Sequence, residues 1–151
     1  MLLGPAHRVA IRGLALPSAR AFATPLGEVE VDRKAAALAL TLPQVVEDDS
    51  VHLLEHALEV QLPFLQAVLD DFRIVPFAVG MATPEDVADV LERLWGGPET
   101  LILVSSDLSH YHAYAEARAI DRGSVDGILA LSPVLDHDQA CGATPINALL
   151  A

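Results

Sequence analysis

The chain has 151 residues, of which 52% are hydrophobic and 20% are charged. This length suits one domain with a core of its own, and the composition excludes an intrinsically disordered chain. The formal net charge of -12 would repel a phosphate backbone, so we expect no nucleic-acid partner. One cysteine excludes an intramolecular disulfide and is typical of the reducing cytoplasm, while no apolar run approaches the ~18 residues of a membrane span.

The first third of the chain predicts two short strands and a helix. Residues 1–3 are typical of the end of a strand and are followed by a Gly-Pro turn. Because a strand of ordinary length needs about five residues, we expect the chain to begin inside a domain. Residues 8–16 predict a second strand or an irregular crossing, and residues 23–27 predict a turn. A helix is predicted over residues 32–40 with Asp32 as its N-cap.

The middle of the chain predicts a helix and a strand, each of which contains a proline. An acidic stretch at residues 47–50 leads to leucines at positions 54, 58, 62 and 65, whose spacing is helical. We expect Pro63 to kink this helix or divide it in two. Residues 73–79 favour a strand, although Pro76 lacks the N–H group that a central strand uses.

The second half of the chain continues the alternation of strands and helices. Thr83 is the predicted N-cap of an amphipathic helix that ends before Gly96. Residues 101–104 predict a buried central strand, residues 115–131 a helix, and Thr144 the N-cap of a last helix. The alternation predicts a layered α/β fold with a mostly parallel sheet flanked by helices.

A dense polar loop follows the predicted central strand. Residues 105–112 read SSDLSHYH and combine hydroxyl groups, the carboxylate of Asp107 and two imidazoles, including His110. Helix capping would explain one of these polar residues but not the histidines. Because ligands bind beyond the carboxyl ends of strands in open α/β sheets, we expect this loop and His7 to meet at one edge of the sheet.

The single thiol adds a second kind of metal donor. Cys141 precedes the predicted last helix, whose dipole favours the thiolate form. Imidazole and thiolate together are a ligand set for a borderline or soft divalent metal. Each residue alone also has a structural interpretation, because a single histidine is usually hydrogen-bonded or solvated and a single cysteine is usually a small buried apolar residue.

Two hydrolase interpretations stay open on the residues alone. His52, Glu55 and His56 match the H-x-x-E-H motif of a group of zinc proteases, although the motif is short. Cys141 as nucleophile with His110 as base would suit a cysteine hydrolase, although the flanking residues match no cysteine-protease signature.

Five motifs together resemble one known family. They occur in the order GPAH (4–7), TPLG (24–27), EHALEVQLPFL (55–65), VSSDLSHYH (104–112) and ACGATPI (140–146). In this order they resemble the Memo-like family, specifically its prokaryotic branch called AmmeMemoRadiSam system protein B. The resemblance extends over nearly the whole chain.

The resemblance implies a fold similar to that of class III extradiol dioxygenases, with a non-haem metal site. It implies that His7 and Cys141 are metal ligands, with iron(II) or copper ahead of zinc as the divalent metal. Asp107 and His110 would line the pocket, with His110 as the acid/base, and His56 and Glu59 would shape its wall. Dioxygenases of this fold have a carboxylate where this family has a cysteine, which argues against ring cleavage.

Two departures from the family pattern lead to further expectations. Family members carry an N-terminal strand with a histidine motif that this chain lacks, and the chain stops soon after Cys141. We therefore expect residues 1–151 to form a single partial domain, truncated at both ends, with a weak, open metal site. An exposed sheet edge would favour self-association.

The resemblance also implies company with radical-SAM and AMMECR1-type proteins. A non-catalytic module that binds a peptide or a partner of such a system is therefore the alternative to a metal-dependent, oxidative activity.

Overall fold

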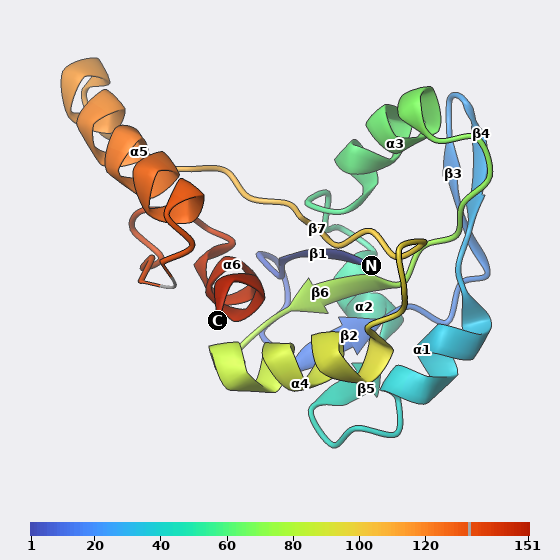
Figure 1. Cartoon of the computed structure of the whole chain (residues 1–151). Helices are drawn as coiled ribbons and strands as arrows, with labels where there is room; N and C mark the ends of the chain where they lie inside the picture. The colour runs from blue at the N-terminus through green and yellow to red at the C-terminus, as the bar shows by residue number, and fades with distance from the viewer. Residues whose placement is uncertain (133) are drawn as a thin grey trace.

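The computed structural model describes residues 1–132 and 134–151. Strands and helices alternate along most of the chain (Figure 1). The elements, in chain order, are β1 (Leu2–Pro5), β2 (Leu14–Leu16), β3 (Ala21–Thr24), β4 (Gly27–Glu30), α1 (Arg33–Ala39), β5 (Val45–Glu47), α2 (Asp49–His52), the 3-10 helix η1 (Glu59–Gln61), α3 (Leu62–Val68), β6 (Pro76–Val79), α4 (Pro84–Leu94), β7 (Leu103–Val104), α5 (Tyr114–Leu129) and α6 (Ala143–Leu150).

The main sheet has the strand order β5-β2-β6-β1-β7. β1 pairs in parallel with both β6 and β7, whereas β2 is antiparallel to β6 and parallel to β5. α4 packs against α1 and against α6, so these three helices form a row beside the sheet (Figure 1). The predicted α/β fold with a mostly parallel sheet flanked by helices is therefore confirmed.

The core is built on the interior strands of this sheet. Leu3 of β1, Leu14 of β2 and Phe77 of β6 are completely buried. Strands covered on both faces carry continuous apolar runs, which is the pattern that these segments show in the sequence. α4 adds Val87 and Val90 to the core, so burial of apolar surface ties this helix to the sheet.

The sequence predicts the starts of two helices correctly from their N-capping residues. Asp32 caps α1 by accepting hydrogen bonds from the N–H groups of Lys34 and Ala35, as expected. Thr83 and Asp86 form a reciprocal capping box at the start of α4. The last helix is different, because its N-cap is Gly142 and Thr144 lies in its first turn. The prediction of Thr144 as the cap was therefore wrong.

The predicted buried central strand at residues 101–104 is instead a two-residue strand at the edge of the sheet. β7 pairs with β1 alone among the described strands, its residues are half-buried, and Leu101 is 54% exposed. The central position belongs to β6, which tolerates Pro76 because this proline is its first residue.

The predicted long helix after residue 47 is divided into three pieces. The break falls at residues 53–58 rather than at Pro63, which lies in the first turn of α3, where its missing N–H costs nothing. Leu54 was expected in the buried stripe but is 65% exposed, because α2 ends before it. The predicted turn at residues 23–27 joins β3 and β4 into an antiparallel hairpin.

α5 stands away from the main sheet (Figure 1), and its Ile128 packs against the small apolar cluster that includes Ala143 and Ile146 of α6. The exposed apolar side chains of α5 include Tyr114 and Leu129, which are 78% and 76% exposed. In the described part of the chain, no helix combines the length and apolarity needed to cross a membrane.

Candidate functional site

The parallel strands bring three loops to one edge of the sheet. β1, β6 and β7 run in the same direction, so the segments that follow them leave the sheet at the same edge. These segments contain His7, Gly80 and the polar loop at residues 105–112. The expectation that His7 and the polar loop share an edge is confirmed.

A cavity of about 490 Å³ lies at this edge. His7 lines it after β1, Gly80 lines it after β6, and Cys141 and Thr144 line it at the start of α6. His7 near the start of the chain and Cys141 near its end therefore line the same cavity.

A buried carboxylate holds His7. Glu55 Oε2 accepts a hydrogen bond of 2.6 Å from the backbone N–H of His7, and Glu55 Oε1 lies 3.1 Å from His7 Nδ1. Oε1 also accepts from the N–H groups of His56 and Ala57, at 2.9 and 3.0 Å. Burial opposes the charged form of Glu55, but these hydrogen bonds outweigh it and hold the pKa of the carboxyl below its usual range.

The sulfur of Cys141 is held by the polar loop. The backbone N–H of Asp107 donates to Cys141 Sγ at 3.2 Å, and the N–H of Cys141 donates to the carbonyl oxygen of Asp107 at 3.2 Å. The N–H of Gly142 donates to Ser106 Oγ at 2.8 Å. These bonds join the loop after β7 to the start of α6 and fix the thiol at the cavity.

Gly142 makes this close approach possible. A Cβ atom at this position would lie 2.8 Å from the Cβ of Ser106 and 2.9 Å from the carbonyl oxygen of Ser105. Gly142 has φ -92°, so its role is to leave space rather than to adopt a left-handed conformation.

Asp107 and His110 are placed differently from His7 and Cys141. Their side chains lie 3.7 Å apart, between Asp107 Oδ2 and His110 Nε2, and are 86% and 43% exposed. Neither residue is among those that line the cavity. The backbone of Asp107 contacts the thiol, whereas its carboxylate pairs with His110 in the loop beside the cavity.

One cavity residue was missed by the sequence reasoning. His137 lines the same cavity as His7 and Cys141, and its Nε2 lies 3.1 Å from Thr144 Oγ1. The available signal was its position four residues before Cys141, which places an imidazole in the segment that leads to the thiol.

The H-x-x-E-H motif does not form the two-histidine helix face of a zinc protease. α2 ends at His52, so His56 does not follow it one helical turn later. His52 Nε2 lies 3.1 Å from the carbonyl oxygen of Ala15, Glu55 holds His7, and His56 lies 3.9 Å from Glu59. The three side chains therefore have three separate partners.

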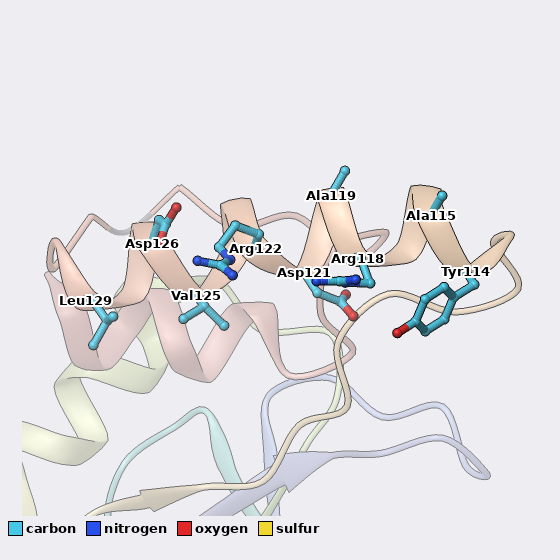
Figure 2. Close-up of a pocket in the computed structure, with 9 residues that line it drawn as sticks. All are labelled: Tyr114, Ala115, Arg118, Ala119, Asp121, Arg122, Val125, Asp126 and Leu129. Carbon is cyan, nitrogen blue, oxygen red and sulfur yellow. The ribbon is translucent and has the colours of Figure 1, made fainter.

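A larger and more open hollow of about 910 Å³ lies along α5 (Figure 2). Its lining comes from this one helix, and includes Tyr114, Arg118 and Leu129 but no histidine or cysteine. The Arg118 guanidinium lies 5.7 Å from the centre of the Tyr114 ring. The two carboxylates of this surface, Asp121 and Asp126, stand among arginines, and it lacks the imidazole and thiol donors of the smaller cavity, so we place the candidate site at the smaller cavity.

The metal-donor set of the cavity is partial. Imidazole and thiol are the donors expected for a borderline or soft metal. However, within residues 1–132 and 134–151 no three His, Cys, Asp or Glu side chains are grouped so that they could hold a metal ion. The donor chemistry fits a metal, whereas the number of protein donors leaves coordination positions for other ligands.

The fold and the cavity define an α/β protein with a candidate ligand site at the carboxyl edge of its parallel strands. The family described as Memo-like protein matches residues 1–150, and the chain belongs to this family.

Three relatives illustrate the match, and each carries the name MEMO1 family protein. The chain is 37% identical over 141 residues to one from Archaeoglobus fulgidus, with 87% of this chain and 51% of the relative covered. It is 37% identical over 164 residues to one from Aeropyrum pernix (98% and 58%) and 32% identical over 164 residues to one from Sulfolobus acidocaldarius (99% and 58%). The chain thus spans just over half the length of these relatives.

Proposed function

We propose that this Memo-like chain is a non-haem metal-binding protein of the AmmeMemoRadiSam system protein B type. The observation that supports this proposal is that His7 and Cys141, from opposite ends of the chain, line one cavity. In this proposal the two residues bind a divalent metal, iron(II) or copper ahead of zinc, and water completes the coordination. The site works in the reducing cytoplasm, which keeps the single cysteine as a thiol.

The roles of the surrounding residues follow from their contacts. A bound iron(II) or copper ion would supply redox chemistry. The N–H of Asp107 holds the sulfur in place at 3.2 Å, and Glu55 holds the imidazole of His7. His110 gives and takes the proton at Nδ1, because its Nε2 lies 3.7 Å from the carboxylate of Asp107, which orients the ring.

Metal titration tests the proposal directly. Anaerobic iron(II) and copper titrations should show saturable binding to the wild type that is lost in H7A and in C141A. H56A is the matched control, because His56 is exposed, pairs with Glu59 and does not line the cavity. Equal binding by the wild type and all three variants would refute the metal site.

Activity is tested separately from binding. Catechol-like compounds under oxygen are the test substrates, because the proposed relation is to class III extradiol dioxygenases, although the cysteine argues against ring cleavage itself. Oxygen-dependent turnover that disappears in H110A would support an enzyme in which His110 moves the proton. Metal binding without turnover would favour the second candidate function.

The second candidate is a non-catalytic module that binds a peptide or a partner protein. The separate position of α5, with Tyr114 and Leu129 exposed on it, favours this function (Figures 1 and 2). By family resemblance its partners would be radical-SAM and AMMECR1-type proteins. Capture of a purified radical-SAM protein by the wild type but not by L129D would support it, and equal capture by both would exclude α5 as the contact.

Self-association is a further proposal, carried by the edge strand. β7 has β1 as its one partner among the described strands, so its other side offers unpaired backbone groups. We expect sedimentation velocity to show a concentration-dependent oligomer. A monodisperse monomer at high concentration would contradict it.

A further inference from the structure

Glu55 is the one buried acidic side chain in the part of the chain that the structure describes. Its side chain is 3% exposed, while that of His7, its partner, is 49% exposed. Buried carboxylates are costly unless their oxygens are hydrogen-bonded. Glu55 is buried next to a candidate metal ligand, so solubility does not explain why an acidic residue stands here.

The hydrogen bonds of Glu55 decide which nitrogen of His7 carries the proton. Both oxygens of Glu55 accept from backbone N–H groups, which can only donate: Oε2 from His7, and Oε1 from His56 and Ala57. The carboxylate is therefore an acceptor on both oxygens. His7 Nδ1, 3.1 Å from Oε1, can join this arrangement favourably only as a donor.

The proton on Nδ1 leaves the other ring nitrogen free. With Nδ1–H directed at Glu55, Nε2 of the neutral ring carries a lone pair on the opposite side of the imidazole. His7 lines the cavity and its side chain is 49% exposed, so we infer that this lone pair is available to a ligand there. The same arrangement orients ligand histidines in many metal sites, where a carboxylate accepts from the nitrogen that does not bind the metal.

We propose that Glu55 is a positioning residue, which locks His7 as the Nδ1–H tautomer and presents Nε2 to the cavity. The proposal rests on the proposed function for what Nε2 binds, but the tautomer itself requires no metal. In the H-x-x-E-H interpretation Glu55 would be a general base, whereas here it orients His7. Glu55 lies in the loop between α2 and η1, so its hydrogen bonds to His7 connect this loop to the segment that follows β1.

The first experiment needs no variant of Glu55. Long-range 1H–15N correlation spectra of metal-free protein with 15N-labelled histidine, recorded well above the usual imidazole pKa of about 6.5, report the tautomer of each neutral ring. The signals of His7 are those that disappear in H7A. We expect His7 as Nδ1–H, and His7 as Nε2–H would overturn the proposal.

The second experiment uses E55Q with E59Q as the matched control. E59Q removes one negative charge from an exposed side chain next to His56, and so reproduces the charge change without touching His7. E55Q keeps one acceptor oxygen but loses the negative charge and the second acceptor. We therefore expect it to reduce the Nδ1–H population of His7 and to weaken metal binding by about 10- to 100-fold, the usual effect of losing such a carboxylate. E59Q should leave both measurements unchanged.

The outcomes separate this proposal from the proposed function. If His7 is Nδ1–H in the wild type but no metal binds, the positioning role stands and the metal site fails. If metal binds and E55Q leaves both the tautomer and the affinity at the wild-type value, the metal site stands and the positioning role fails. Should E55Q not fold, the wild-type spectrum still decides the tautomer.

Discussion

Replacing Gly142 by alanine tests how the cavity is assembled. The added Cβ would lie 2.8 Å from the Cβ of Ser106 and 2.9 Å from the carbonyl oxygen of Ser105, so the start of α6 must move away from the polar loop. The movement would weaken the bonds from Gly142 N to Ser106 Oγ, from Cys141 N to Asp107 O and from Asp107 N to Cys141 Sγ.

The expected destabilisation follows from these bonds. Each is worth about 0.5–1.5 kcal/mol net, so their loss costs about 1.5–4.5 kcal/mol. Alanine returns about 0.4–1 kcal/mol by restricting the unfolded chain. We therefore expect G142A to lower the free energy of unfolding by about 1–4 kcal/mol in urea titrations.

A matched control separates the steric effect from the general effect of losing a glycine. A Cβ at Gly127, in the interior of α5, meets no atom within 4 Å, so G127A should stabilise the protein by about 0.5–1 kcal/mol. G142A should also expose Cys141, and its reaction with Ellman's reagent should accelerate relative to G127A. A G142A variant as stable as G127A, with an unchanged thiol rate, would refute this account of the cavity.

Three further predictions concern stability. F77A should cost about 3–5 kcal/mol in urea because Phe77 is completely buried, whereas F64A, at a 71% exposed position, should cost far less; similar losses would contradict the assigned core. T83A should cost about 1 kcal/mol by removing the capping box of α4, and an unchanged midpoint would show that the box contributes nothing. Burial lowers the pKa of His52 in the folded protein, although its hydrogen bond to Ala15 O opposes this. As the pH falls, His52 therefore binds a proton in the unfolded chain before it does so in the folded protein. The contribution of neutral His52 to the free energy of unfolding should be complete above about pH 6.5 and should decrease as the pH falls towards the pKa of His52 in the folded protein. H52Q should reduce this pH dependence, and a pH dependence equal to that of the wild type would contradict the prediction.

The features that the sequence predicts well are local. Asp32 and Thr83 act within one helical turn, so their capping roles can be inferred from neighbouring residues. The position of β7 at the edge could not be inferred, because an apolar run does not tell which strand will lie beside it. The role of Glu55 was hidden for a related reason: the motif predicts a continuous helix, but the helix ends at His52 and Glu55 turns to His7 instead.

Part of the candidate site can likewise be predicted from the sequence, and part of it cannot. That His7 and the polar loop share an edge follows from parallel strands, and the sequence alone predicts it. The cavity contact of His137 depends on the path of the segment before α6, for which the sequence offers only a spacing of four residues from Cys141.

The reversal of direction between β6 and β2 gives the molecule two chemically separate ends. β2 and β5 run opposite to β1, so the segments after them emerge at the far edge, where Asp49 accepts hydrogen bonds from the N–H and hydroxyl of Ser18. A fluorophore or surface tether attached beside this pair would report on or immobilise the protein while leaving the mouth around His7 and Cys141 unobstructed.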